Sequence, residues 1–310
     1  MNFIYCLDKN YNTQAIMSFY TLNSVIEKEI TVYIAHSDPS SLKIEIDKFE
    51  FQKLNFKFLE INNKFNLPNL ENSHVTEATY YRIFAINLLP EKIDHIIYID
   101  SDILFNKDPY LHYKKYIEEL QQSEYIISAN TIGEYETEEI STVEYFDYME
   151  MDDKYFNAGV IIYDLNKYRK NTVGERLEKH LINFNKEARY WDQDILNTFF
   201  NGKYLELPKT LNNNVVTEDK DIIIEEVLNS ITIHFAGKTK PWHVLGMKYP
   251  LGCFFQEKYR EIYKKNYFIS PFNKIRHIKE VLDFINNRKN YCVENYFKFL
   301  SSCLIKIIKL

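Results

Sequence analysis

Two aspartates separated by one residue follow an apolar segment near the middle of the chain, and their spacing suits a metal ion. Asp100 and Asp102 come directly after residues 95–99, whose sequence HIIYI predicts a buried strand. Alternate side chains of an extended chain share one face, so both carboxylates can point at the same cation. Carboxylate oxygens suit Mg²⁺ or Mn²⁺, which need few protein ligands when substrate phosphates supply the others. The pattern by itself also fits a helix cap or a solvated loop.

A second predicted strand, residues 231–235, also ends in polar residues. His234 is a candidate nitrogen ligand, which would favour Mn²⁺ over Mg²⁺. Gly237 permits the backbone to approach an anion closely, and Lys240 can neutralise a phosphate as a point charge. A lone histidine at a strand end is more often structural, so the functional interpretation depends on the neighbouring glycine and lysine.

Two further segments place polar side chains beside predicted elements. Asp192, Gln193 and Asp194 stand at the start of a predicted helix, where Asp192 could be the N-cap and Asp194 could interact with the helix dipole. The uncharged amide between them would suit a partly cationic carbon. Asn157 precedes a predicted strand at 160–163, where it could bind a ligand or serve only a turn.

Short β-rich segments alternate with helical-period segments before residue 240, and several strands are apolar on both faces. That pattern is typical of strands buried between two helical layers. It predicts an α/β fold with a mostly parallel sheet, in which ligands bind outside the carboxyl ends of the strands. The predicted strands are 3–7, 31–36, 56–61, 95–99, 125–128, 160–163 and 231–235, and the predicted helices include 40–51, 76–88 and 172–184.

Composition excludes several classes of protein. The 310 residues are 45% hydrophobic and 26% charged, which excludes a disordered chain or a fibre, and the net charge of −6 argues against a nucleic-acid-binding surface over the whole protein. The four cysteines are scattered, so we expect neither a zinc site nor a disulfide framework, and we expect a reducing compartment. The seven glycines form no phosphate-binding motif of a phosphoryl-transfer enzyme.

Taken in order along the chain, these segments resemble glycosyltransferase family 8. The resemblance covers about residues 1–245 and includes Asp8-Lys9-Asn10-Tyr11 and Thr79-Tyr80-Tyr81-Arg82 besides the segments above. It implies a GT-A (Rossmann-like) fold and a retaining hexosyltransferase that uses a UDP-sugar, UDP-galactose or UDP-glucose, with Mn²⁺ or, as the alternative, Mg²⁺. The similar members extend bacterial lipopolysaccharide or lipo-oligosaccharide cores, so the expected acceptor is a glycan or glycolipid.

The resemblance also assigns residues by position. Asp100, Asp102 and His234 would hold the metal that bridges the donor phosphates, and Gly237 and Lys240 would complete the diphosphate site. The other donor contacts would come from Asp8 and Asn10 near uracil and ribose, Ser101 between the metal ligands, and Arg82, Asn157, Asp192 and Gln193 around the sugar, while His74 falls where an acceptor contact is expected. Asn130 stands where the family often has an aspartate, which leaves the choice between glucose and galactose open.

Retention of configuration could follow either of two routes. A carboxylate could form a covalent intermediate in two displacements, or the acceptor could attack the same face within an ion pair. Gln193 is a poor nucleophile, so we favour same-face attack, with Gln193 and Asp192 supporting the cationic carbon and the departing phosphate oxygen taking the acceptor's proton.

Beyond residue 250 the sequence becomes helical and basic, so we expect a catalytic domain at 1–250 and a C-terminal region at 251–310. Residues 296–310 interleave bulky apolar residues with lysines, which suits a helix on an anionic membrane surface; a terminal helix packed on the core is the alternative. No signal peptide or membrane span is evident. We therefore expect a cytoplasmic enzyme, peripheral on the inner face of the membrane.

Two other functions stay open from the sequence. One is a non-catalytic protein of the same fold that binds a nucleotide sugar or a glycan. The other is a family 8 transferase with a non-lipid acceptor, similar to glycogenin or the galactinol-forming enzymes. The complete set of expected metal ligands and Lys240 favours an active enzyme.

Overall fold

The computed structural model describes residues 1–61, 80–134, 140–152, 154–219, 221–270 and 275–309. The chain folds as two compact units, Met1–Asn212 and Asn213–Leu310. The functional boundary expected at residue 250 stays a prediction.

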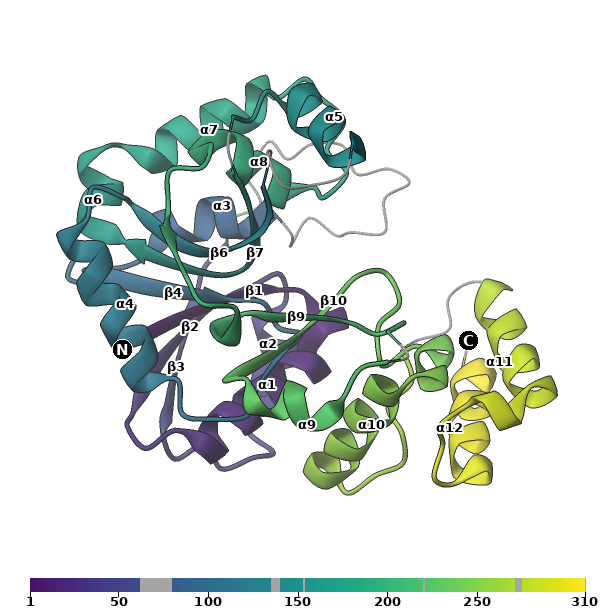
Figure 1. Cartoon of the computed structure of the whole chain (residues 1–310). Coiled ribbons are helices and arrows are strands. Elements are labelled where there is room, and N and C mark those ends of the chain that lie inside the picture. The colour runs from purple at the N-terminus through teal and green to yellow at the C-terminus, as the bar shows by residue number, and fades with distance from the viewer. Residues whose placement is uncertain (62–79, 135–139, 153, 220, 271–274, 310) are drawn as a thin grey trace. The chain divides into compact units, whose positions relative to one another are not determined.

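The N-terminal unit is built on a sheet in which seven strands can be described, in the order β3-β2-β1-β4-β7-β6-β8 (Figure 1). Neighbouring strands pair in parallel except at β7, which runs antiparallel to β4 and β6. The predicted mostly parallel sheet is therefore confirmed. The strands are β1 (Asn2–Leu7), β2 (Ile30–His36), β3 (Leu54–Leu59), β4 (His95–Ile99), β6 (Ile127–Glu134), β7 (Lys154–Asp164) and β8 (Leu205–Glu206). The short β5 (Ile103–Phe105) follows β4 and is not one of these seven strands.

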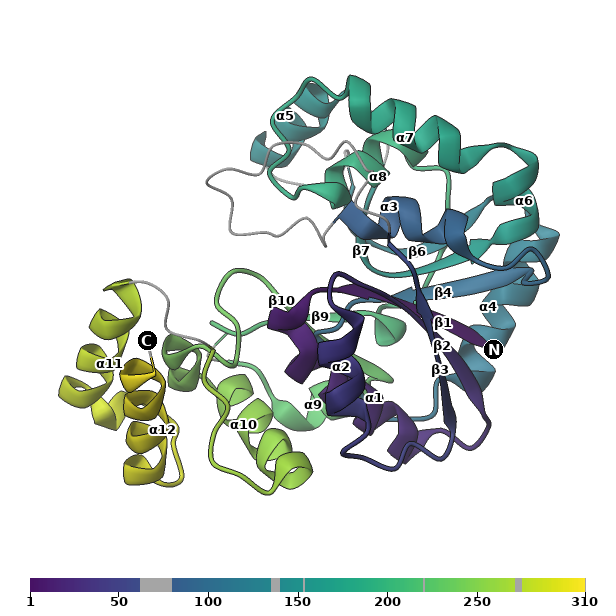
Figure 2. The ribbon, with the colours of Figure 1, turned by 180° about the vertical axis from the view of Figure 1, so that it is seen from behind.

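Helices cover both faces of this sheet, as Figure 2 shows from behind. Alternate residues of β1 make the two cores. Ile4 belongs to a cluster with residues of α3, α6, α7 and α8, whereas Phe3 packs edge-on against Tyr113 of α4, and Tyr5 against Phe19 of α1. The helices are α1 (Asn12–Val25), α2 (Pro39–Ile46), α3 (Tyr81–Ala85), α4 (Tyr110–Gln122), α5 (Ile140–Met149), α6 (Leu165–Lys170), α7 (Val173–Asn183) and α8 (Asp192–Phe200).

The element boundaries differ from the sequence expectation where tertiary pairing overrides local preference. The strand predicted at 160–163 begins at Lys154, because its first residues pair with β6 through an irregular register that includes Asn130 opposite Asn157. Asn157 therefore lies in a strand and not in a turn before one. The helix predicted at 40–51 ends at Ile46, and Phe49 and Phe51 pack on aromatic neighbours instead.

The C-terminal unit combines a parallel strand pair with helices. Its strands pair Ile233 with Asn213 and His234 with Asn214. Phe284 of α11 packs edge-on against Phe299 of α12, and both belong to a buried cluster with Cys303. The elements are β9 (Asn213–Val216), α9 (Ile224–Asn229), β10 (Thr232–Ala236), α10 (Pro250–Tyr263), α11 (Ile275–Asn286) and α12 (Tyr296–Ile308).

The terminal helix α12 thus packs by one face, as one sequence alternative expected, but it leaves large apolar residues exposed on another. Phe297 is 78% exposed and Ile308 is 82% exposed. Among the described residues, no helix is long and apolar enough to cross a membrane.

Candidate active site

A turn at the carboxyl end of β4 presents the two aspartates. The Asp100 N–H donates to the Gly159 carbonyl of β7 at 2.8 Å, and the Ile103 N–H donates to the Asp100 carbonyl at 3.2 Å. Ser101 and Asp102 lie in this turn, so the extended geometry expected from the sequence is wrong. Both residues are largely buried. Because a buried carboxylate is stable only beside opposite charge or hydrogen-bond donors, Asp102 makes this turn a candidate site.

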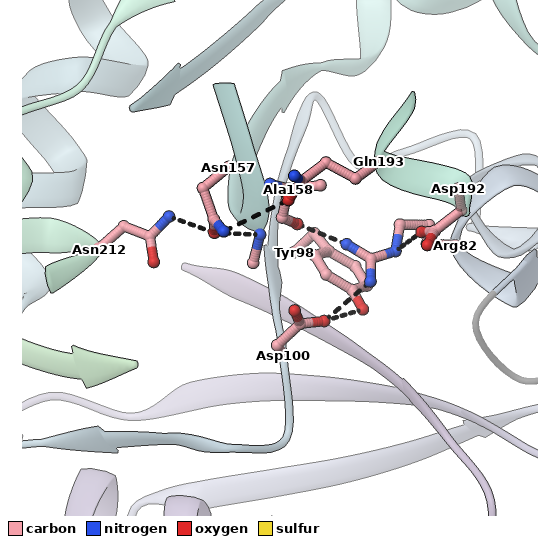
Figure 3. A network of polar contacts seen from close by, with 9 residues as sticks. Arg82, Tyr98, Asp100, Asn157, Ala158, Asp192, Gln193 and Asn212 are labelled. Atoms are coloured by element: carbon pink, nitrogen blue, oxygen red, sulfur yellow. Dashed lines mark hydrogen bonds and ion pairs between the residues drawn. The ribbon is translucent and has the colours of Figure 1, made fainter. Parts of the chain in front are cut away.

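Arg82 of α3 links the turn to the start of α8 (Figure 3). Its Nη2 donates to Asp100 Oδ1 at 3.1 Å, its Nη1 donates to the Ala158 carbonyl at 2.5 Å, and its Nε forms an ion pair with Asp192 Oδ2. The guanidinium lies 4.4 Å from the centre of the Tyr98 ring, and the Tyr98 hydroxyl donates to the same Asp100 oxygen at 2.6 Å. One buried cation therefore fixes two acids from different elements.

Burial sets the electrostatics of this network. Burial raises the pKa of Asp192 to about 7, and Arg82 opposes the shift. Burial alone would lower the pKa of Arg82, but Asp100 and Asp192 raise it well above its usual value. Arg82 therefore carries a permanent charge, which it shares between the two carboxylates.

Gln193 belongs to α8, and its side-chain amide lies against β7 beside this network (Figure 3). Its Oε1 accepts from the Ala158 N–H at 3.0 Å and from Asn157 Nδ2 at 3.3 Å, and its Nε2 donates to the Tyr155 hydroxyl at 3.0 Å. Asn157 Oδ1 in turn accepts from the Gly159 N–H and from Asn212 Nδ2, both at 2.9 Å. The structure therefore brings together four residues expected around the donor sugar, Arg82, Asn157, Asp192 and Gln193.

Two residues of α8 that were given no role at the donor site hold the helix against β7. Asn197 accepts from the Phe156 N–H at 2.8 Å and donates to the Phe156 and Gln193 carbonyls, both at 2.9 Å. Asp194 accepts from the Tyr155 hydroxyl and from the Tyr190 N–H, both at 2.7 Å. Asp192 is the first helical residue, not the N-cap; Trp191 occupies the cap position with a φ of 50°.

Asp8 and Asn10, which were expected near the uracil and ribose of the donor, directly follow β1. Asp8 Oδ1 accepts from the Asn10 N–H at 2.8 Å, so the two residues form one short turn. His36, at the end of the neighbouring β2, donates through Nε2 to Asn12 Oδ1 at 2.8 Å if Nδ1 accepts from the Asp38 N–H at 2.7 Å. This tautomer is neutral, and burial lowers the pKa of His36.

Asn130 lies in β6, and its Nδ2 donates to the Leu207 carbonyl at 3.1 Å. It is buried. The side chain thus has a structural partner on the segment that follows β8, and its assignment to the donor site stays a prediction.

The remaining expected residues of the C-terminal unit occupy β10 and the loop after it. His234 is buried in β10. Gly237 has a φ of 85°, which favours glycine, and a Cβ built there would meet nothing within 4 Å. Lys240 Nζ donates to the Phe235 carbonyl at 2.6 Å, which folds the lysine along its own loop. His74 lies outside the described residues.

Sequence reasoning missed the residues that support this site. Tyr98 looked like a core residue of an apolar strand, Asn197 ended the segment that begins at Asp192 but was given no role, and Asn212 was not singled out. Their roles follow from contacts between distant segments, which spacing along the chain does not reveal. A polar residue within an otherwise apolar segment, such as Asn197, was the available signal.

Comparisons with known proteins give one matching family and several similar proteins. The model of "Glycosyl transferase family 8" matches residues 2–246. A lipopolysaccharide 1,2-glucosyltransferase of Escherichia coli is 27% identical over 235 residues, which cover 72% of this chain and 64% of that protein. General stress protein A of Bacillus subtilis is 28% identical over 267 residues, covering 78% of this chain and 87% of that protein.

Among solved structures, an active-site mutant of LgtC superposes with a TM-score of 0.64 at 19% identity, covering 85% of this chain and 95% of LgtC. A second structure of the galactosyltransferase LgtC, in complex with donor and acceptor sugar analogs, gives a TM-score of 0.58 at 20% identity, covering 84% and 95%. This likeness shows the fold and confirms the expected GT-A type.

Proposed function

Because the chain belongs to glycosyl transferase family 8, we propose that it is a retaining hexosyltransferase that moves glucose or galactose from a UDP-sugar to a hydroxyl group of a glycan or glycolipid. The similar E. coli protein is named a lipopolysaccharide 1,2-glucosyltransferase, and LgtC has been solved with donor and acceptor sugar analogs. We extend this to the present chain as a role in bacterial surface polysaccharide synthesis.

One observation carries the proposal, which is the network around Arg82. It joins the turn of Asp100, the strand residues Asn157 and Ala158, and the first turn of α8 with Asp192 and Gln193. All lie in the N-terminal unit, at the end of the strands where ligands bind in α/β sheets. A donor sugar held here would meet fixed charges and amides that need no rearrangement.

We assign Asp100, Asp102 and His234 as the ligands of one divalent cation. Each offers one ligand atom, a carboxylate oxygen or an imidazole nitrogen. Two carboxylates with one imidazole suit Mn²⁺ better than Mg²⁺. A bound cation would stabilise the negative charge that UDP gains as its bond to the sugar breaks. Gly237 and Lys240 are assigned to the diphosphate, through a backbone N–H and an ammonium group.

Same-face attack fits the arrangement of the acids and amides better than a covalent intermediate. Asp192 is buried and paired with Arg82, and the side-chain oxygen Oε1 of Gln193 accepts two hydrogen bonds. Neither group is therefore an exposed nucleophile. As the sugar carbon becomes cationic, the negative charge of Asp192 and the carbonyl dipole of Gln193 stabilise it. The departing phosphate oxygen takes the proton of the acceptor hydroxyl.

The donor is tested by hydrolysis of UDP-glucose, UDP-galactose and their uronates with the full chain, with and without Mn²⁺. We expect hydrolysis of either UDP-glucose or UDP-galactose, and we expect this activity to be lost when a chelator removes the metal. Asp102→Asn removes charge at constant shape and should abolish turnover while thermal unfolding changes little. Binding of the sugar nucleotide without any turnover, for every donor and acceptor, would instead support a binding protein.

Peripheral contact with an anionic membrane is the last part of the proposal, because a lipid-linked acceptor requires the enzyme near the bilayer. Lysines flank the exposed Phe297 and Ile308 of α12. Such a surface favours anionic headgroups. Phe297→Ser with Ile308→Ser should reduce sedimentation with phosphatidylglycerol vesicles. The control is Leu111→Ser of α4, because Leu111 is also a highly exposed apolar residue. Unchanged sedimentation of the double variant would contradict the contact.

A further inference from the structure

A cavity of about 750 Å³ lies in the C-terminal unit, at the end of α10 and the start of α12. Four cationic side chains line it, from Arg260, Lys264, Lys265 and Lys298. The acid in its lining is Glu294. The formal charge of these five groups is 4 − 1 = +3, within a chain whose net charge is −6.

The acid does not neutralise the lysines. Glu294 Oε2 is paired with Arg260 Nη2 at 2.7 Å. The ammonium groups of Lys264, Lys265 and Lys298 have no hydrogen bond or ion pair to any residue that the structure describes. Arg260 Nη1 is buried and also lacks a hydrogen-bond partner within the described chain. A buried cationic donor without an acceptor is costly, so the cavity is suited to an incoming anion.

The wall of the cavity is fixed by Tyr267. The Arg260 guanidinium lies 4.2 Å from the centre of the Tyr267 ring, and the Tyr267 hydroxyl accepts from the Asn295 N–H at 3.3 Å. The same ring packs edge-on against Phe299 at 5.2 Å, and Asn295 caps α12 by accepting from the Lys298 N–H at 2.9 Å. Packing therefore fixes Arg260 and the start of α12 at the cavity, and a ligand of opposite charge would offset the repulsion between the cations.

We propose that this cavity binds a phosphate group, as a phosphate monoester or a diphosphate. A phosphate carries up to two negative charges and several acceptor oxygens, which match three ammonium groups and the Arg260 guanidinium better than a single carboxylate does. The site belongs to the C-terminal unit alone and is separate from the residues assigned to the UDP-sugar. It does not depend on the proposed transfer reaction.

The test is amide hydrogen exchange of the full chain in inorganic phosphate, compared with chloride at equal ionic strength. We expect slower exchange at residues 260–267 and 294–298. In the variant Lys264→Ala, Lys265→Ala, Lys298→Ala the phosphate affinity should fall roughly tenfold or more. The control Lys48→Ala, Lys114→Ala, Lys115→Ala loses the same charge from exposed lysines of the N-terminal unit and should keep the protection.

All three lysines of the cavity are exposed, so their removal should leave thermal unfolding unchanged; Lys298→Gln alone provides a milder second variant. No protection by phosphate over chloride, or equal protection in the cavity variant and the wild type, would overturn the proposal.

Lipid vesicles distinguish a phosphate in a lipid headgroup from a free phosphate compound. The vesicles consist of phosphatidylcholine with either phosphatidic acid or the same fraction of phosphatidylserine. If the group is a lipid headgroup, phosphatidic acid should give the same protection and the cavity variant should lose it. If it is a free phosphate compound, inorganic phosphate should protect and neither vesicle should. Protection by phosphatidylserine that persists in the cavity variant would count against a phosphate site.

Discussion

Arg82 of α3 and Asp192 of α8 form a buried ion pair through Nε, although the two residues are far apart along the chain. The remaining guanidinium nitrogens reach Asp100 and the Ala158 carbonyl. The geometry of the turn after β4 and of the first turn of α8 therefore depends on one side chain.

Replacing Arg82 by lysine tests this dependence. A lysine keeps the charge but cannot make three separate contacts with planar geometry, so kcat should fall roughly 100-fold. The matched control is Arg169→Lys. Arg169 donates to the backbone carbonyls of Pro90, Glu91 and Ile93, so its variant should lower thermal stability with kcat near the wild-type value. Equal kcat in the Arg82→Lys variant and the wild type would contradict the role of the bridge.

Gln193 is expected to act on the sugar during the reaction more than in donor binding. Gln193→Ala removes an amide held by Ala158, Asn157 and Tyr155. We expect kcat to fall roughly 100-fold with a smaller change in KM for the donor. Steady-state kinetics at saturating acceptor measure both, and a pure KM effect would mean that Gln193 only binds the donor. Detection by mass spectrometry of a glycosyl adduct on Asp192 or Asp194 would replace same-face attack with two displacements.

Asn197 provides a test of how α8 is held. Its amide makes three hydrogen bonds, two buried ones to both backbone groups of Phe156 and a partly buried one to the Gln193 backbone carbonyl. Asn197→Ala leaves these groups unpaired and should lower the free energy of unfolding by about 2 to 4 kcal/mol. Urea denaturation measures this loss. Asn183→Ala, at an exposed helix end with one amide hydrogen bond to the Lys179 carbonyl, is the control and should cost much less.

His36 predicts a pH dependence of stability. Burial lowers its pKa below the ordinary 6.5, so the folded state binds the proton less readily than the unfolded state does. The contribution of His36 is therefore complete above pH 6.5 and is lost as the pH falls below it. Urea denaturation above and below that pH gives the difference in the free energy of unfolding. This difference should be smaller in His36→Gln than in the wild type. His112→Gln, on the exposed side of α4, should behave as the wild type.

The fold was largely predictable because its signals are local. The apolar segment at 95–99 coincides with β4, and the alternation of strands and helices predicted the mostly parallel sheet. The first half of β7 was missed, because Asn157, Ala158 and Gly159 have low strand propensity, whereas the pairing of residues 154–157 with β6 extends the strand. The candidate site residues followed from motifs, whereas the bridge by Arg82 and the support from Tyr98 depend on tertiary contacts that no local pattern encodes.

We propose that the two aspartates after β4 and His234 bind one divalent cation, and titration of the metal-free protein with Mn²⁺ is the decisive measurement. Isothermal titration calorimetry or the electron paramagnetic resonance signal of Mn²⁺ should show one Mn²⁺-binding site per chain in the presence of UDP. Asp102→Asn and His234→Ala should each lower the Mn²⁺ affinity at least tenfold. Asp94→Asn, at the opposite end of β4, should leave the affinity unchanged. Wild-type Mn²⁺ affinity in both ligand variants would contradict the account.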